Sequence, residues 1–234
     1  MSMKRILSRW LLSCCIISTV ACHKKKDDSL YATHIAIAHF VPNADSISVL
    51  YDEQKISGNR ALSYGTATTQ NGLAYLAPGS GTHNMRILSG TTPIKDNIYT
   101  YGAGIYYSLF LYDSLKAGTV KTALIQDAVS PVDSLAQIRF INMVADAATI
   151  QIVFEKDTAL AISDIYLGSK TTLAYPFSTL RPGSWRVSLR RNNAVIVQPA
   201  PYELLRGKLY SFVAKGVKGA SGVYAESLLL MKHN

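Results

Sequence analysis

The sequence predicts an all-β fold, with two tandem immunoglobulin-like β-sandwich domains that follow a lipoprotein signal peptide. Three observations lead to this prediction. Short runs rich in Val, Ile, Thr, Tyr and Phe alternate with Gly, Pro and Asn along the body of the chain, as strands and turns do in a sandwich. Three landmark motifs occur twice in the same order. A basic and then apolar segment begins the chain and ends at a cysteine.

The N-terminal segment has the pattern of a secretory signal. Lys4, Arg5 and Arg9 form a basic start, and residues 10–20 form an uncharged, mostly apolar block. A helix needs about 20 apolar residues to cross a bilayer, so this block is too short for a comfortable span. We therefore expect the chain to be cut after Ala21, which leaves residues 1–21 as the signal peptide.

Cys22 follows the expected cut directly, where bacterial lipoproteins carry the cysteine that receives the lipid. The stretch from Thr19 to Cys22 resembles this lipobox, although its first position is usually Leu. Cys14 and Cys15 are rival acceptors, but a cut there would leave only about three apolar residues of the roughly seven expected. The alternative is a cysteine behind an ordinary signal peptide. Lipidation of Cys22 is favoured because the mature chain has no other cysteine for a disulfide.

The residues after Cys22 predict a location. Two or three acyl chains anchor a protein stably, since each buried methylene adds about 0.8 kcal/mol. His23 stands where an aspartate commonly retains lipoproteins at the inner membrane. Lys26, Asp27 and Asp28 are similar to the lysine-plus-acidic-pair export signal of surface lipoproteins in glycan-foraging Gram-negative bacteria; the alternative is a solvated tether. We expect lipid attachment to the outer membrane, with the body facing the cell surface.

The body contains an internal repeat. The landmarks are Phe40 with Ala44-Asp45 and Phe140 with Ala145-Asp146, Pro-Gly-Ser at 78–80 and 182–184, and Gly-x-x-Tyr-Ser from Gly104 and from Gly207. Their separation exceeds the roughly 20–50 residues of a solenoid unit, so we predict two copies of one domain. The expected boundaries are a lipidated cysteine with a flexible tether at 22–32, a first sandwich at 33–127, a linker at 128–135 and a second sandwich at 136–234.

Alternation predicts which side chains face the core. The strand after the second Pro-Gly-Ser turn places apolar and polar residues alternately, at Trp185, Val187 and Leu189 and at Arg186, Ser188 and Arg190. When the two turns are superposed, Val187 falls on His83, Leu189 on Met85 and Arg190 on Arg86. This alignment predicts that His83 faces the core or its margin.

The repeated motifs resemble domain-of-unknown-function family 4397 over nearly all of residues 33–232. In the second copy the resemblance is carried by Phe140, Ile141, Asn142, Asp146 and Ala147. In the first copy, Pro42 replaces the asparagine of the motif, and Ser46 replaces the alanine after Asp45. The resemblance implies a secreted or lipid-anchored tandem β-sandwich with no established activity and no catalytic residues to carry over.

Sequence signatures of catalysis are missing: there is no Gly-x-Ser-x-Gly, Walker, Gly-x-Gly-x-x-Gly or His-Glu-x-x-His motif. His34 and His39 lie five residues apart on one expected strand, so they point to opposite faces and cannot chelate one metal. Asp45 and Asp146 suggest calcium or acid catalysis, but a loop aspartate that caps its own turn is commoner. We expect no enzymatic activity, no cofactor and no metal.

The charge is uneven. Residues 129–234 contain 12 basic and 7 acidic groups, whereas residues 31–128 contain six of each. Arg186 and Arg190 on one strand face suggest binding of acidic glycans or lipopolysaccharide phosphates, and the alternative is a solvated strand face. Nucleic acid is not an expected partner, because aromatic and basic residues are too little interleaved.

Tyrosines crowd around the Gly102-Ala103-Gly104 turn. Tyr99 and Tyr101 are candidates for stacking on sugar rings, and the alternative is that most of this cluster belongs to the core. Tyr107 matches Tyr210 in the repeat, which predicts a structural role for that position.

These features predict a non-enzymatic binding or adhesion module, held to the membrane by its lipid and directed at a surface protein or a glycan. The alternatives are a glycan-binding accessory lipoprotein of an uptake system and a purely structural spacer. The linker at 128–135 is short and contains proline, so a restricted angle between the sandwiches is expected.

Overall fold

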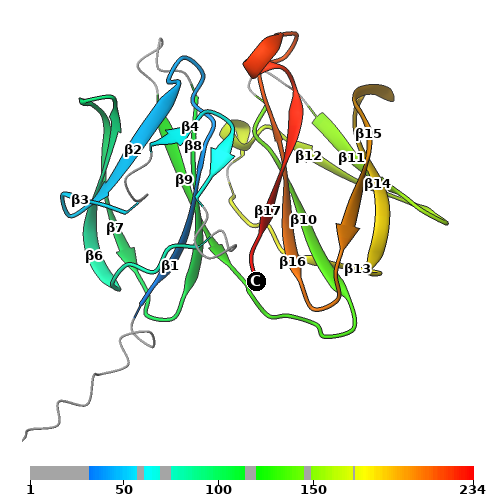
Figure 1. Ribbon diagram of the computed structural model, residues 1–234, viewed down its shortest axis with the longest axis horizontal. Helices are drawn as coiled ribbons and strands as arrows, with labels where there is room; N and C mark the ends of the chain where they lie inside the picture. The colour runs from blue at the N-terminus through cyan, green and yellow to red at the C-terminus, as the bar shows by residue number, and fades with distance from the viewer. Residues whose placement is uncertain (1–31, 57–60, 69–74, 114–119, 145–148, 171) are drawn as a thin grey trace, which may run out of the picture.

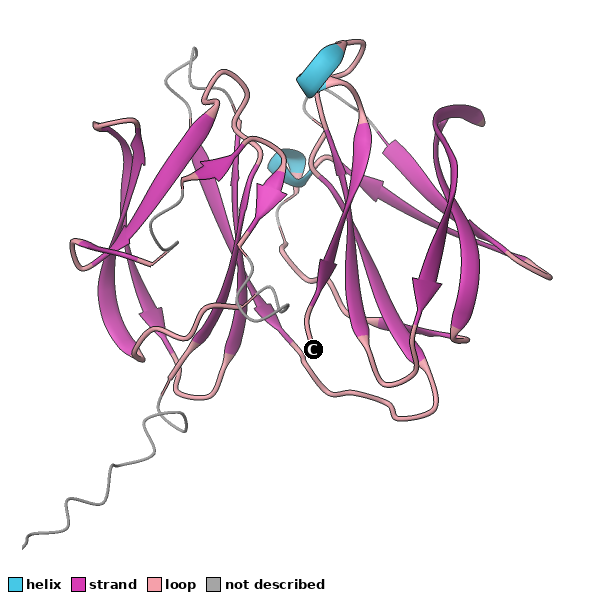
Figure 2. Ribbon diagram, in the orientation of Figure 1, coloured by secondary structure: helices cyan, strands magenta, loops and turns pink. Residues whose placement is uncertain are grey.

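A computed structural model describes residues 32–56, 61–68, 75–113, 120–144, 149–170 and 172–234 (Figure 1). These residues form strands and two short 3-10 turns, η2 (Leu167–Ser169) and η3 (Gly222–Tyr224) (Figure 2). The prediction of an all-β fold of sandwiches is confirmed. Within the described part of the chain, no helix has the length and apolar character needed to cross a membrane.

The first sandwich consists of two sheets. The strands of the first sheet, in the order β5-β1-β8-β9, are β5 (Thr66–Ala67), β1 (His34–His39), β8 (Tyr106–Tyr112) and β9 (Lys121–Asp127). Those of the second, in the order β3-β2-β6-β7, are β3 (Gln54–Lys55), β2 (Ser46–Tyr51), β6 (Gly81–Ser89) and β7 (Thr92–Tyr101), and β4 (Leu62–Ser63) also pairs with β2.

The second sandwich repeats this strand order. One sheet, in the order β13-β10-β16-β17, has β13 (Ser178–Leu180), β10 (Ala136–Asn142), β16 (Leu209–Lys215) and β17 (Ser227–Lys232). The other, in the order β12-β11-β14-β15, has β12 (Ala159–Ile165), β11 (Thr149–Glu155), β14 (Gly183–Arg191) and β15 (Ala194–Leu204). In both sandwiches the strand that begins the unit runs parallel to its neighbour, β1 to β8 and β10 to β16.

Each sandwich has its own core, and a third core joins them. Side chains that alternate along the strands fill the two cores; Trp185, Val187 and Leu189 are buried in the second, as alternation predicts. The third cluster lies between β5-β1-β8-β9 and β13-β10-β16-β17 and includes Phe110 from the first sandwich and Val213 from the second. The four sheets therefore stack as four layers, and the inner two are in buried contact (Figure 1).

The strand pairing corrects the register predicted for β6 and β14. Gly81 and Gly183 begin these strands with φ of 120° and 121°, a conformation that favours glycine. Counting from them, Val187 matches Met85 instead of His83, so the alignment of the Pro-Gly-Ser turns was two residues off. Because two residues are one full period of a strand, His83 still lies at the margin of the core, with its ring centroid 4.2 Å from that of Tyr51.

The match of Tyr107 with Tyr210 is confirmed. Each hydroxyl accepts a hydrogen bond from a backbone N–H five residues earlier, at Gly102 (3.1 Å) and Leu205 (3.0 Å). The strand registers give further equivalent pairs, which are Ala36 and Arg139, His39 and Asn142, Tyr64 and Tyr166, Tyr75 and Phe177, Ser108 and Ser211, Tyr112 and Lys215, and Asp127 and His233.

His39 therefore occupies the position of the motif's asparagine in the first copy. Its Nδ1 accepts a hydrogen bond from Val41 N–H (3.3 Å), just as Asn142 Oδ1 accepts one from Val144 N–H (3.0 Å). The interpretation that Pro42 replaces the asparagine is wrong, because the imidazole makes the equivalent turn-closing contact. The match of Phe40 with Phe140 is also wrong, because the strand registers match Phe140 with Ile37 and leave Phe40 equivalent to Met143.

Candidate functional site

The residues expected to carry the anchor and the export signal lie outside the described residues, as do Asp146 and Ala147 of the family motif. These residues are Cys22, Lys26, Asp27 and Asp28. In the view of Figure 1, β1 starts at the lower end of the first sandwich, whereas η2 and η3 lie toward the upper end.

The two tyrosines proposed to stack on sugars belong to the first sandwich's interior. Tyr101 is 2% exposed and packs between Tyr51 and Tyr107, with ring centroids 5.9 and 5.4 Å away. Burial raises the pKa of its hydroxyl. Tyr99 is partly buried, and its hydroxyl donates to Thr122 Oγ1 at 2.6 Å. Tyr101 therefore has no ring face free for a sugar, and Tyr99 is held in place by neighbouring side chains.

The two candidate arginines do lie on one outer strand face, but they differ in environment. Arg186 is exposed, while Arg190 donates from Nη2 to Glu155 Oε1 at 2.7 Å. Glu155 is also the cross-strand neighbour of Arg186. One carboxylate thus offsets part of the charge of both guanidinium groups, and the face is less cationic than the sequence suggests.

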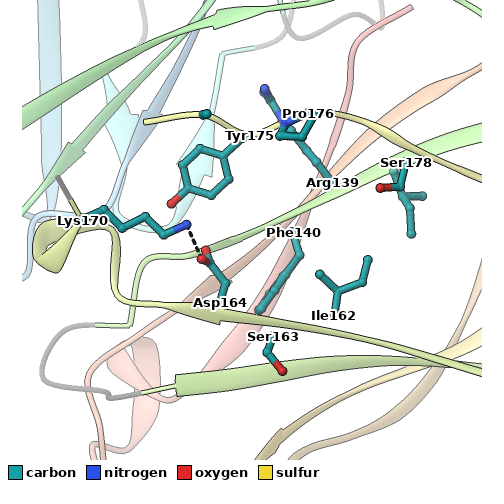
Figure 3. Close-up of a pocket in the computed structure, with 11 residues that line it drawn as sticks. Arg139, Phe140, Ile162, Ser163, Asp164, Lys170, Tyr175, Pro176 and Ser178 are labelled. Atoms are coloured by element: carbon teal, nitrogen blue, oxygen red, sulfur yellow. Dashed lines mark ion pairs between the residues drawn. The ribbon is translucent and has the colours of Figure 1, made fainter. Parts of the chain in front are cut away.

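A pocket of about 230 Å³ lies in the second sandwich, beneath the segment that connects β12 to β13 (Figure 3). Its apolar lining comes from Ile138, Phe140, Ile162, Ala174 and Pro176, and its polar lining comes from Arg139, Ser163, Asp164, Lys170, Tyr175 and Ser178. Ligand pockets of drug size span roughly 300–1,000 Å³, so this one has room for a single small ring.

An ion pair dominates one end of the pocket. Lys170 Nζ pairs with Asp164 Oδ1 and also lies 4.1 Å from the centroid of the Tyr175 ring (Figure 3). Asn142 N–H donates to the other carboxylate oxygen of Asp164 at 2.9 Å, which holds the carboxylate in place. Burial, followed by the nearby Asp164 charge, raises the pKa of Tyr175, so its hydroxyl remains protonated. Since the ammonium offsets the carboxylate, the pocket is close to neutral and offers both donors and acceptors.

Beside the pocket, a buried polar network links the two sandwiches. Arg139 donates from Nη1 to Asp127 Oδ1 (2.6 Å), from Nη2 to Ser108 Oγ (3.0 Å) and from Nε to Ser211 Oγ (2.6 Å). The side chains of Arg139 and Asp127 are 1% and 0% exposed. Asp127 Oδ2 also accepts from Ser108 (2.7 Å) and from Tyr75 (2.5 Å).

The hydrogen bonds of this network define the state of His233. Because Tyr75 donates its proton to Asp127, its oxygen accepts one from His233 Nδ1 at 2.6 Å. His233 Nε2 then accepts the Ser211 hydroxyl proton, also at 2.6 Å. Every proton has an acceptor only when the imidazole is neutral. Burial first, and then the Arg139 charge, lowers the pKa of His233 to about 3, in agreement with this assignment.

The Ser211–His233 contact has the composition of a nucleophile and its base, but not the setting. Ser211 is 0% exposed, and its oxygen accepts a hydrogen bond from the Arg139 guanidinium, which withdraws electron density from it. The network joins Ser108 of β8 to Ser211 of β16 through Arg139, so its buried hydrogen bonds connect the two inner sheets.

The two buried histidines predict an acid-dependent loss of stability. Burial lowers the pKa of His39 to about 4, although its Nε2–H still donates to Ala44 O. An unfolded histidine titrates near pH 6.5, so below that pH the unfolded chain binds protons that the folded chain does not. Each histidine should cost about 2 kcal/mol of unfolding free energy between pH 6.5 and 5. Denaturant unfolding measured at a series of pH values tests this.

His39→Asn provides the matched variant, because asparagine is the residue at the equivalent position, Asn142. The variant should lose about half of the pH dependence below pH 6.5 while differing from the wild type by a constant offset above pH 7.5. Equal slopes in the two proteins below pH 6.5 would show that His39 does not titrate on unfolding as expected.

The sequence contains one signal for the buried network. Arg139 is a charged residue inside the strand Ala-Gln-Ile-Arg-Phe-Ile-Asn, every residue of which is buried. A charge in such a run requires a buried partner. The partner's identity depends on the packing of the two sandwiches, which no local pattern specifies.

A comparison with family models finds that the one described as "Domain of unknown function (DUF4397)" matches residues 33–153. The matched range covers the first sandwich and continues through β10 into β11 of the second. No curated protein sequence matches the chain significantly.

Proposed function

The chain belongs to the family described as Domain of unknown function (DUF4397), and we propose that it acts as a non-enzymatic binding module, lipid-anchored at the outer membrane. We also propose that the second sandwich is a second copy of the family's domain. The support for this is that both sandwiches have the same strand order, the same parallel pairing and the same tyrosine contact.

The pocket beneath the β12–β13 connection is the observation that carries the binding role. It combines an apolar wall with a fixed ion pair, as small-molecule sites do. The two inner sheets pack against each other through buried side chains, and we expect this contact to keep the pocket at a constant position relative to the start of β1. A rigid presentation suits a module that displays a site at a distance from its anchor.

Glycan binding in an uptake system is the second candidate, and the lining of the pocket favours it. A sugar ring presents C–H groups on its faces and hydroxyls around its edge. Ile162 and Pro176 offer apolar contacts for the former, while Asp164 accepts and Lys170 donates hydrogen bonds for the latter. An uncharged ligand is expected, because the ion pair leaves no net charge to bind a counterion.

Filling the pocket should abolish ligand capture. Ile162→Trp places a large ring in the apolar lining of the pocket, whereas Ala161→Trp, at the preceding residue of β12, places the same ring at an exposed position on the opposite face of the strand (Figure 3). On a glycan array and in cross-linking to isolated cell envelopes, Ile162→Trp is expected to lose at least about tenfold in signal. The Ala161→Trp control should bind like the wild type. No carbohydrate signal at millimolar concentration would rule out the glycan candidate, and identical capture by both variants would rule out the pocket.

The export signal gives a separate prediction. Exchange of Lys26, Asp27 and Asp28 for neutral residues should leave the lipid in place but keep the body inside the cell. Protease added to whole cells would then spare the variant and degrade the wild type, with immunoblotting as the measurement. Lysed cells serve as the control, because both proteins should be degraded there. Equal degradation in whole cells would disprove the export role of these three residues.

A further inference from the structure

Two contacts between the sandwiches involve equivalent residues with their roles exchanged. Tyr112 of β8 contacts Tyr166 of the second sandwich, with ring centroids 6.1 Å apart. The equivalents of these residues are Lys215 of β16 and Tyr64, and they also meet, with Lys215 Nζ 5.9 Å from the ring centroid. When position i of one unit contacts position j of the other and j also contacts i, the interface is isologous, as in a two-fold dimer.

The apolar part of the interface has the same symmetry. The third core cluster contains both members of several equivalent pairs: Ala38 and Ile141, Phe40 and Met143, Phe110 and Val213, and Ile125 and Met231. Each sandwich thus presents to the other the same face of the same sheet. The single chain therefore contains an internal pseudo-dimer of its two units.

The buried polar network between the inner sheets breaks this symmetry. Ser108 and Ser211 are identical at equivalent positions, but Asp127 is matched by His233, and Arg139 is matched by Ala36. Two first sandwiches paired through this face would bury two Asp127 carboxylates and no cation. Two second sandwiches would bury two Arg139 guanidinium groups, with His233 in place of the Asp127 carboxylate and with Asp164 already paired to Lys170. An unpaired buried charge costs several kcal/mol, so only unlike sandwiches complement each other.

From this geometry we propose that the inner face of each sandwich is a recognition surface whose partner is the unlike sandwich of this chain, selected by Asp127, Arg139 and His233. This surface holds the sandwiches together without help from the covalent linker. The proposal is independent of any ligand in the pocket.

Cutting the linker tests the proposal in the full chain. A protease site inserted after Ser130, in the 128–135 segment, allows the folded protein to be cut between β9 and β10. The two fragments are expected to co-elute in size-exclusion chromatography at micromolar concentration and to sediment as one particle. Fragments that separate at this concentration would overturn the proposal.

A charge exchange tests the selection rule. The pair of changes Ala36→Arg and Asp127→His gives both sandwiches the pattern of the second, and should weaken association of the cut fragments at least about 100-fold. Adding Arg139→Ala and His233→Asp transfers the first sandwich's pattern to the second. The fragments of this quadruple variant should regain an affinity within about tenfold of that of the cut wild type. Two results would show that these residues do not select the partner: equal affinity in the cut wild type and the double variant, or an affinity in the quadruple variant no higher than in the double variant.

Discussion

Arg139→Ala is expected to lower the free energy of unfolding by about 3–5 kcal/mol, because it leaves the Asp127 carboxylate buried without its counterion. The Asp127 side chain is 0% exposed, and Arg139 Nη1 is its only cationic partner among the described hydrogen bonds and ion pairs. The change also leaves Ser108 and Ser211 without the donors that now reach their oxygens. Chemical denaturation followed by circular dichroism measures the loss.

The expected loss of unfolding free energy comes mainly from the unpaired Asp127 charge. A double-mutant cycle separates this contribution from the loss of side-chain packing. Asp127→Ala alone should also destabilise strongly, because the guanidinium group is then unpaired. The double variant should be less destabilised than the sum of the single changes, by a coupling energy of about 1–3 kcal/mol. Additive single effects, or a loss below about 1 kcal/mol for Arg139→Ala, would mean that water or another group compensates the carboxylate.

Patterns that depend on neighbouring residues predicted much of the fold. Alternation in β14 placed Trp185, Val187 and Leu189 in the core because a half-buried strand has a period of two residues. The Gly-x-x-Tyr-Ser motif matched Tyr107 with Tyr210 correctly, because the tyrosine contacts a backbone N–H only five residues away. Both features are local, so both are visible in a linear sequence.

The register of the Pro-Gly-Ser turns was wrong for a related reason. Proline and glycine recur wherever a chain must turn, so two turns can share residues without occupying equivalent positions. The register of a strand is set instead by which side chains pack and pair, and Gly81 and Gly183 mark it here by their positive φ. The substitution of His39 for the motif's asparagine was missed with it, since chemical equivalence at that turn becomes visible only once the hydrogen bonds are known.

The candidate site was less predictable than the fold. Tyr101 was proposed as a surface aromatic, yet its neighbours on β2 and β8 bury it. The pocket is formed by β10, β12 and the segment before β13, which are adjacent only after the sheets have stacked. The network joins residues up to 158 positions apart, as between Tyr75 and His233. Contacts of this kind depend on how the two sandwiches are placed, and a reading of local patterns contains no information about that.

Cys22→Ala is expected to abolish membrane attachment of the mature protein. The acyl chains are transferred to the cysteine thiol, and the methyl group of alanine cannot accept them. The variant therefore lacks the two or three acyl chains, each of whose buried methylenes contributes about 0.8 kcal/mol to membrane binding. The apolar block at 10–20 is too short to replace them as a membrane span. Mass spectrometry of the wild-type membrane fraction should find an N-terminal peptide that begins at Cys22 and carries acyl chains.

The Cys22→Ala chain should instead remain uncut or be cut aberrantly, which intact-mass measurement of the expressed protein resolves. Cys14→Ser and Cys15→Ser are the matched controls, because they remove the rival thiols from a segment that is itself expected to be removed. Both controls should yield the same lipidated peptide as the wild type. A wild-type mature chain that starts at another residue without lipid would disprove the anchor. Loss of lipidation in Cys14→Ser or Cys15→Ser would instead place the lipid on that cysteine. Neither result bears on the proposed association of the two sandwiches, because that proposal rests on buried side chains of β1, β8, β9, β10, β16 and β17.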